Sequence, residues 1–98
     1  MPTYTRLPRF LKDYAALSPR EQASFKAAVA KFAEDLAAGE FCKGLGVRGV
    51  QGAGGIFELR WADDGRATFE YGPPVAGHEG EPHVIWRRVG THAIFERP

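Results

Sequence analysis

The sequence has 98 residues, of which 44% are apolar and 26% are charged. This length and composition fit one small globular domain and exclude a wholly disordered chain. No apolar run approaches the roughly 20 residues of a membrane span, and the first residues lack the apolar stretch of a secretory signal. Cys42 is the only cysteine, which excludes an internal disulfide framework and a cysteine-based structural zinc site. We therefore expect a cytoplasmic protein without membrane contact.

The charge balance argues against a strongly basic nucleic-acid-binding protein. The chain has 13 Lys and Arg against 12 Asp and Glu, a net charge of +1. Up to Phe41 there are 6 basic and 5 acidic residues, and 7 of each follow. Since neither half is a basic tail, any binding of nucleic acid requires a local cluster of cations.

The first half of the chain is predicted to be helical. A short strand over Thr3–Arg6 precedes a helix within residues 7–17, where apolar side chains recur at helical spacing. Ser18 is a good N-cap for a second helix, and Glu21 stands where a capping box requires a carboxylate. Gly39 is expected to end that helix in the left-handed conformation. The break at Ser18 predicts a hairpin of two helices.

The second half is predicted to consist of strands between glycine-rich and proline-rich loops. Strands are expected over residues 56–61, 66–71 and 83–89, and residues 47–50 are a further strand candidate. The order is therefore β-α-α-β-β-β. This order predicts an α+β domain in which the helical hairpin backs one face of an antiparallel sheet.

The hairpin that joins the strands over 56–61 and 66–71 decides which side chains share a face. Two rows of apolar residues alternate along these strands: Phe57, Leu59 and Trp61, and Ala67, Phe69 and Tyr71. A three-residue loop over 63–65, with Gly65 left-handed, puts both rows on one face. Arg60, Arg66 and Thr68 then project from the opposite, uncovered face.

Three common chemical motifs are missing or out of place. Residues 44–49 match G-x-G-x-x-G, but they follow a helix and lead into strands, whereas a dinucleotide site requires the reverse. His78 and His83 lie five residues apart across a Gly/Pro loop, without the spacing of a metal site. The G-x-S-x-G turn of serine hydrolases is absent. We therefore expect neither a metal nor a cofactor.

The remaining chemical signal is a group of cations with one histidine. Its members are Arg60, Arg66, Lys43, Arg48, one of Arg87 and Arg88, and His92. Guanidinium groups bind phosphate and stabilise the charge of a pentacovalent transition state, and an imidazole exchanges protons near neutral pH. These functions suit metal-independent RNA cleavage, because the 2′-hydroxyl of RNA supplies the nucleophile. The alternative is a solvated charge network in which Glu58 and Glu70 neutralise the arginines.

The sequence resembles the RelE/ParE superfamily of toxins from type II toxin–antitoxin systems. The similarity lies in the stretches GLGVRGVQGAGGIFELRWADDGRATFEYG and HVIWRRVGTHAIF, and it is greatest to RelE-like ribosome-dependent mRNA interferases. It extends over most of the chain, and the order β-α-α-β-β-β agrees with the fold of that family. The resemblance therefore implies one RelE/ParE-like toxin domain over residues 1–98.

The resemblance also implies roles for single residues. Arg66 matches the arginine that contacts the scissile phosphate, and Arg60 falls on the arginine of the preceding strand. His92 matches the position of a general acid or base, which completes the implied catalytic set. Phe95 stands where several members have a tyrosine, so that position lacks a hydroxyl. The residues implied or expected to bind RNA are Lys43, Arg48, Arg87 and Arg88.

The resemblance to this family also implies an activity. Such a toxin enters the ribosomal A site, and the 2′-hydroxyl of the mRNA attacks the adjacent phosphate to leave a cyclic phosphate. The implied partners are mRNA, the ribosome and a cognate antitoxin, whose amphipathic helix docks by its apolar face. A non-nuclease alternative remains, because the net charge is low for a ribosome-dependent toxin. That alternative is a ParE-like gyrase inhibitor or a degenerate toxin that retains only antitoxin binding.

Overall fold

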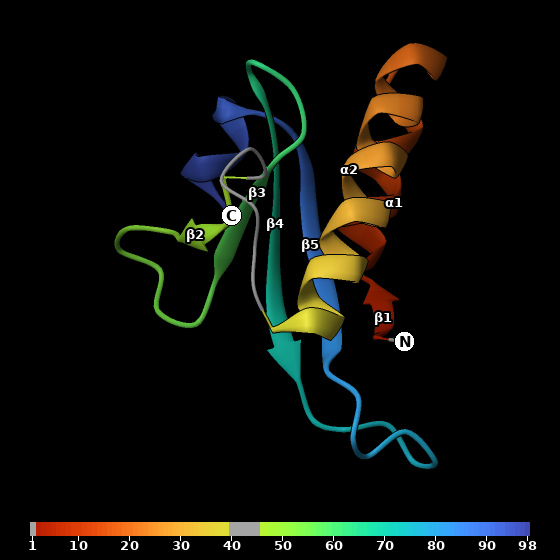
Figure 1. Cartoon of the computed structure of the whole chain (residues 1–98). Helices are drawn as coiled ribbons and strands as arrows, with labels where there is room; N and C mark the ends of the chain where they lie inside the picture. Colours follow the sequence, from red (N-terminus) through yellow and green to blue (C-terminus); the bar gives the residue numbers. More distant parts are fainter. Residues whose placement is uncertain (1, 40–45) are drawn as a thin grey trace.

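The computed structural model describes residues 2–39 and 46–98. The elements in chain order are β1 (Thr3–Arg6), α1 (Pro8–Ala15), α2 (Pro19–Ala38), β2 (Arg48–Gly49), β3 (Phe57–Arg60), β4 (Gly65–Gly72), β5 (His83–Thr91) and the 3₁₀ helix η2 (His92–Glu96). The strands form one sheet in the order β1-β5-β4-β3-β2. Figure 1 shows α1 and α2 on one side of this sheet and η2 on the other.

Both ends of α2 agree with the sequence prediction. The Glu21 amide donates to Ser18 Oγ at 3.1 Å, and the Ser18 amide donates to Glu21 Oε1 at 2.8 Å, which completes the capping box. At the other end Gly39 has φ 79°, in the left-handed region that glycine adopts without a Cβ penalty. Local chemistry therefore determines where this helix begins and ends.

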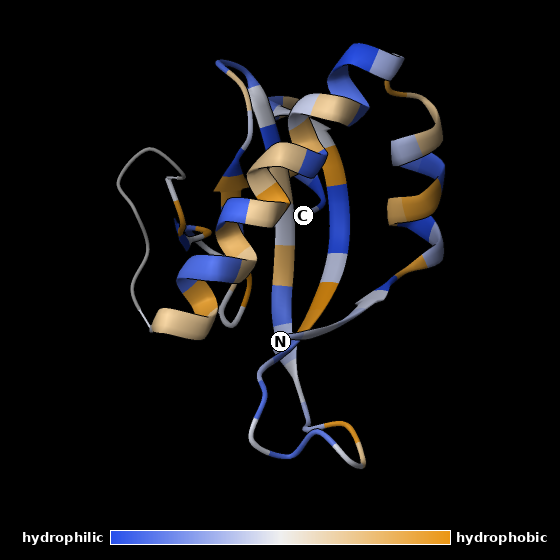
Figure 2. Ribbon diagram, turned by 45° about the vertical axis from the view of Figure 1, so that its right-hand side comes forward, coloured by the Kyte–Doolittle hydropathy of each residue, from blue (hydrophilic) through white to orange (hydrophobic). Residues whose placement is uncertain are grey.

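The core lies between the two helices and one face of the sheet. Its most buried aromatic side chains are Phe10, Phe25, Phe32, Phe69 and Trp86. The ring centroids of Phe32 and Phe69 are 5.0 Å apart, and those of Phe25 and Trp86 are 5.6 Å apart. Figure 2 shows hydrophobic positions on both helices and along the central strands.

The prediction of a purely antiparallel sheet is wrong at one edge. β1 pairs in parallel with β5, with Thr3 opposite His83 and Arg6 opposite Trp86. The hydroxyls of Thr3 and Thr5 lie 2.8 Å and 2.9 Å from the two ring nitrogens of His83 and fasten this edge. The sequence does not reveal strand direction, because side chains alternate between faces in the same way in either direction.

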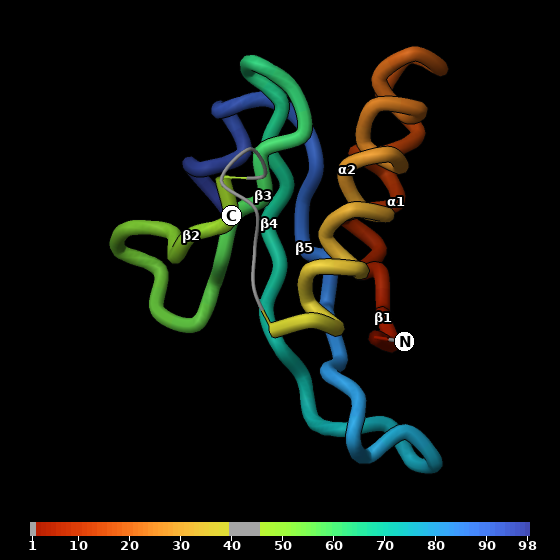
Figure 3. Tube along the Cα trace, viewed as in Figure 1, coloured from red at the N-terminus to blue at the C-terminus, as the bar shows by residue number. Residues whose placement is uncertain are grey.

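The predicted element order is also incomplete. Four strands, not three, follow the helices, because the candidate over 47–50 forms the two-residue strand β2 against β3. The last strand reaches Thr91 rather than residue 89. The predicted loop between β4 and β5 is confirmed. Figure 3 shows that this loop extends beyond the end of the sheet, away from η2. The fold is thus α+β with a mixed five-stranded sheet.

The sharing of faces predicted for the β3–β4 hairpin is confirmed, but the predicted three-residue loop over 63–65 is wrong, because residues 61–64 join the two strands. Leu59 pairs with Ala67, and Arg60 pairs with Arg66. The predicted conformation of Gly65 is wrong, since its φ is not positive and it is the first residue of β4. A Cβ at this position would lie 2.6 Å from Cε2 of Trp61. Glycine is required here by the close approach of the indole ring, not by a left-handed turn.

Gly65→Ala is therefore expected to destabilise the protein by about 1–3 kcal/mol, the usual cost of forcing an extra methyl group into a packed site. The free energy of unfolding from urea denaturation measures this change. Gly54→Ala is the matched control, because a Cβ added at Gly54 would meet nothing within 4 Å and the φ of this residue is not positive. Equal stability of the two variants would contradict the packing explanation.

The sheet face opposite the helices is not as open as predicted. The side chains of Glu58, Arg66 and Thr68 project from this face, and their residues are 5%, 7% and 0% exposed. The helix η2 packs against β4 and β5 on this side and buries Ile94. The predicted uncovered face is therefore a partly covered site whose polar residues are enclosed by the C-terminal segment.

Candidate active site

The register of three strands brings the predicted catalytic residues to one end of the face that η2 covers. Arg60 on β3 pairs with Arg66 on β4, and Arg66 pairs with Gly90 on β5. His92 directly follows Thr91, the last residue of β5. Residues far apart in the sequence are therefore neighbours at this end of the sheet.

Arg66 is buried and held in one position. Its Nη1 donates to the carbonyl oxygens of Gly65 at 2.9 Å, Asp63 at 3.2 Å and Ala62 at 3.3 Å. Among the described residues Arg66 has no ion-pair partner within 4.0 Å. The hairpin loop thus orients the guanidinium group but leaves its positive charge without a carboxylate counterion.

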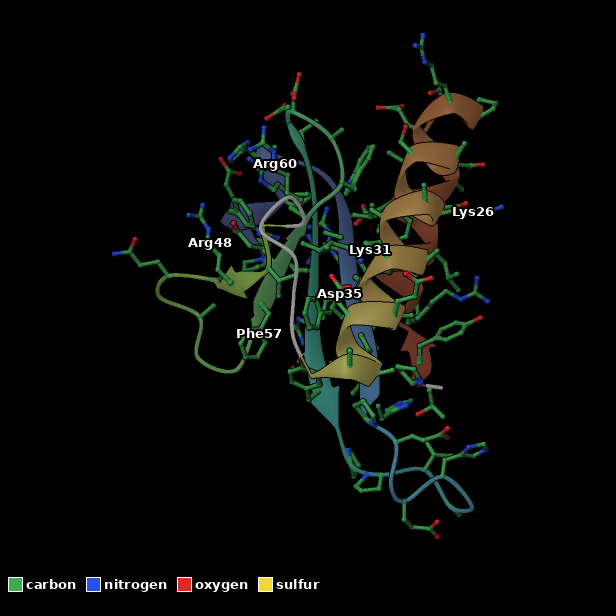
Figure 4. All side chains as sticks on the ribbon, viewed as in Figure 1. Lys26, Lys31, Asp35, Arg48, Phe57 and Arg60 are labelled. Atoms are coloured by element: carbon green, nitrogen blue, oxygen red, sulfur yellow. The ribbon has the colours of Figure 1, made fainter. Side chains whose placement is uncertain are left out.

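A hollow of about 150 Å³ lies beside this guanidinium group. Its lining residues are Gly46, Arg48, Glu58, Arg60 and Arg66. Arg60 donates from Nε to the carbonyl of Ala62 at 3.4 Å, and its side chain is about half exposed. Figure 4 shows Arg48 and Arg60 on the side of the sheet away from Lys26 of α2. Three guanidinium groups around one small volume suit the binding of a phosphate group.

A second hollow, of about 380 Å³, adjoins the first. It is lined by Arg48, Gly49, Val50, Gln51, Glu58, His92 and Phe95. Arg48 and Glu58 line both hollows, so they lie at the boundary between them. The Arg48 Nε donates to Glu58 Oε1 at 2.6 Å. A buried carboxylate therefore lies between the arginine hollow and the histidine hollow.

His92 forms a pair with a carboxylate. Its Nδ1 lies 2.6 Å from Oδ1 of Asp64, and its ring meets the Phe95 ring edge-on at 5.6 Å between centroids. This hydrogen bond lowers the pKa of Asp64, with smaller contributions from the charges of His92 and Arg66. An ionised carboxylate only accepts hydrogen bonds, so Nδ1 carries the proton and Nε2 is the nitrogen left to exchange one.

Removing the imidazole should raise the pKa of Asp64. In the wild-type protein this pKa lies below its ordinary value of 3.8, because the hydrogen bond from His92 favours the ionised form. His92→Ala is expected to return it toward 3.8, as measured by an NMR titration of the side-chain carboxyl. The stabilisation from this pair is present above the ordinary pKa and is lost as the pH falls through the lowered one.

Glu79 is the internal control for that titration. Backbone hydrogen bonds of its own loop lower its pKa, so His92→Ala should leave it unchanged. An unchanged Asp64 pKa in the variant would show that the pair does not form in solution.

The structure separates Arg87 from Arg88, which the sequence does not. The pairing of β4 with β5 shifts between Thr68 and Phe69, so β5 has one extra residue there. Arg87 lies 3.3 Å from the Glu70 carboxylate and shares the face of the candidate site. Arg88 instead binds Asp13 of α1 through two hydrogen bonds of 2.6 Å and 3.1 Å. Arg88 is thus engaged with the helical layer, whereas Arg87 shares the face of the candidate site but lines neither of its hollows.

Sequence reasoning misses the carboxylates of this site. It places Asp64 in a turn, and it considers Glu58 only as a neutralising partner of the arginines. The feature that brings Asp64 to the site is the register of β4 and β5. Gly65 pairs with Thr91, and this pairing brings the turn that contains Asp64 beside His92. Lys43, predicted to bind RNA, lies outside the described residues.

The described part of the chain contains no group of three or more His, Cys, Asp or Glu side chains placed to hold a metal ion. Among the helices of the same residues, none has the length and apolar character needed to cross a membrane.

Solved structures identify the fold. No protein-family model matches the sequence, and no curated protein matches it either. A chain of the E. coli DinJ–YafQ toxin–antitoxin complex superposes with a TM-score of 0.70 at 14% identity, over 94% of this chain and 93% of that chain. A chain of the RelB–RelE antitoxin–toxin complex from Methanococcus jannaschii superposes with a TM-score of 0.61 at 18% identity, over 95% and 98%. The protein therefore has the RelE-like fold shared by these chains.

Proposed function

We propose that the protein is the toxin of a type II toxin–antitoxin system, with one RelE/ParE-like domain over residues 1–98. Its proposed activity is that of a metal-independent, ribosome-associated endoribonuclease that cleaves mRNA through attack by the 2′-hydroxyl. The observation that carries the proposal is the pair of adjoining hollows, one lined by Arg60 and Arg66 and the other by His92. The fold shared with chains of toxin–antitoxin complexes supports the same function.

The arginine hollow would bind the scissile phosphate. Arg66 is oriented by three carbonyl groups before any substrate binds, so little reorganisation is needed when negative charge develops in the transition state. Arg60 is more exposed and would contact the other non-bridging oxygen. Arg48 lines both hollows and Arg87 lies outside them on the same face of the sheet, and both would contact neighbouring phosphates of the RNA.

Cleavage needs one group that accepts a proton and one that donates a proton. As the bond between the 2′-oxygen and phosphorus forms, the Glu58 carboxylate would accept the proton of the 2′-hydroxyl. As the bond from phosphorus to the 5′-oxygen breaks, protonated His92 donates the proton from Nε2 to that oxygen. Asp64 would act as a positioning residue that holds the imidazole through Nδ1. The products are a 2′,3′-cyclic phosphate and a 5′-hydroxyl.

The proposed partners are mRNA, the ribosome and a cognate antitoxin. The purified protein with translating ribosomes and a defined mRNA tests the activity, and mapping of the 5′ ends locates the cuts. Arg20→Ala is a control for the loss of positive charge, because Arg20 lies on α2 and lines neither hollow. Cuts at A-site codons by both the wild-type protein and Arg20→Ala would support the proposal. An mRNA that stays intact with the wild-type protein would refute it.

A specific observation also favours a second candidate, a non-nuclease toxin or a degenerate toxin that retains antitoxin binding. Arginines on this side of the chain and at its helices are paired with carboxylates within 4.0 Å. The pairs are Arg48–Glu58, Arg60–Asp63, Arg87–Glu70 and Arg88–Asp13. Such pairs reduce the positive potential available to RNA. Inhibition of gyrase supercoiling by the purified protein, with mRNA left intact, would favour a ParE-like function.

A further inference from the structure

A third hollow lies on the opposite side of the sheet, among the helices. It has a volume of about 330 Å³, and its lining comes from β1, α1, α2 and β5. The lining residues are Tyr4, Arg6, Phe10, Tyr14, Phe25, Lys26, Val29 and Trp86. None of them lines the two hollows of the candidate active site. The proposed cleavage of RNA does not use this hollow.

The walls of this hollow are aromatic and fixed. Phe10, Phe25 and Trp86 are 2%, 5% and 4% exposed, so the floor belongs to the protein core. Their ring centroids lie 5.6–6.1 Å apart, which is ordinary contact for aromatic rings. A site of this kind is formed before any ligand binds and accepts a large apolar group at little cost in ordering.

Two cations stand at the mouth of the hollow. Arg6 on β1 and Lys26 on α2 are both exposed, and neither has an ion-pair partner in residues 2–39 and 46–98. Figure 4 shows the Lys26 side chain pointing outward from α2, away from Arg48 and Arg60. Arg48 and Arg60 of the candidate active site differ from these two cations, because each of them lies beside a carboxylate. The rim of the helix-side hollow is therefore a positive surface without an internal counterion among the described residues.

Large apolar side chains are exposed both in the lining of the hollow and on the face of α1 that contributes to it. Tyr4 and Leu11 are 62% and 45% exposed. Leu11 precedes Tyr14 by three residues, so the two share a face of α1. Clusters of exposed apolar side chains beside a concave site are typical of a surface that binds another protein.

We propose that this helix-side hollow binds an acidic segment of a partner protein that inserts one large apolar side chain. The apolar side chain fills the space against Phe10, Phe25 and Trp86, and carboxylates of the same segment face Arg6 and Lys26. The apolar area around Tyr4 and Leu11 favours a polypeptide over a small molecule. Only two cations border the hollow, which is few for binding along a phosphate backbone.

Synthetic peptides test this proposal without reference to RNA cleavage. The probe is an acetylated, amidated hexapeptide in which Leu-Phe is flanked by two glutamates on each side, and fluorescence anisotropy of a labelled form gives the affinity. Saturable binding to the wild-type protein is expected. A peptide with lysine flanks, and a glutamate-flanked peptide with Ala-Ala at its centre, should each bind at least about tenfold more weakly.

Charge-reversal variants test whether the peptide binds at this hollow. Arg6→Glu and Lys26→Glu should each weaken binding of the glutamate-flanked peptide by about tenfold, whereas Arg20→Glu should leave it unchanged. All three positions are exposed, and unchanged melting curves check that the variants fold. No saturable binding, equal binding of the lysine-flanked peptide, or tighter binding of a single-stranded RNA oligonucleotide to this face would overturn the proposal. Because the readout is peptide affinity, it fails or succeeds independently of the proposed nuclease.

Discussion

Arg66→Ala is expected to reduce mRNA cleavage by about 10²–10³-fold, the effect of removing one oriented group that stabilises transition-state charge. The guanidinium lines the arginine hollow and is fixed by three carbonyl oxygens of the hairpin loop. The rate of cleavage in single-turnover reactions measures the effect, because that rate excludes product release. The loss should appear in this rate more than in affinity for the substrate.

Two further variants separate this catalytic role from a structural one. Arg66→Lys keeps the charge but loses the planar geometry that matches a phosphate, so its activity should fall between those of Arg66→Ala and the wild-type protein. Arg20→Ala removes one positive charge from α2 and should retain full activity. Wild-type activity of a folded Arg66→Ala protein would remove Arg66 from the mechanism.

His92→Ala is expected to lower cleavage by about 10²–10⁴-fold, the usual contribution of a general acid or base. The assignment of His92 as the acid and Glu58 as the base makes a sharper prediction. In a substrate whose 5′-bridging oxygen is replaced by sulfur, the thiolate leaves without protonation. His92→Ala should therefore recover most of its activity on that substrate, whereas Glu58→Gln should remain impaired because the 2′-hydroxyl still needs a base.

Glu58 is buried and pairs with Arg48, so the folding of Glu58→Gln needs its own check. Arg48→Ala is the matched variant, because it removes the same ion pair but leaves the carboxylate. Rescue of Glu58→Gln by the sulfur substrate would reverse the two assignments. Absence of rescue for His92→Ala would show that the histidine does not protonate the leaving group.

Elements determined by local chemistry are predictable from the sequence. The capping box at Ser18 and the left-handed Gly39 define α2 without any tertiary information. Alternation on both strands predicts that Leu59 and Ala67 share a face, but not that they pair directly, because the loop expected over residues 63–65 would have paired Trp61 with Ala67. The parallel pairing of β1 with β5 is not predictable, because it depends on contacts between the two ends of the chain. The need for glycine at position 65 has a different cause from the predicted one, since only the structure places the Trp61 ring against it.

The sequence predicts which cations belong to the site, but not how they and the carboxylates are arranged. The placement of Arg60 and Arg66 on one face follows from the hairpin register. The difference between Arg87 and Arg88 depends on an irregularity in β5 that the mixed pattern of that strand does not reveal. The contact between Asp64 and His92 joins residues 28 positions apart, so it requires the pairing of β4 with β5. Tertiary pairing, rather than composition, brings these carboxylates to the cations.

The chemistry at the cut ends tests the proposed mechanism most directly. Mass spectrometry of the upstream fragment, from an mRNA cut by the purified protein on translating ribosomes, identifies its 3′ terminus. Attack by the 2′-hydroxyl predicts a 2′,3′-cyclic phosphate there, and a single 2′-deoxy substitution at the cut site should abolish cleavage. A 3′-hydroxyl terminus, cleavage that survives the 2′-deoxy substitution, or an mRNA that stays intact would contradict it.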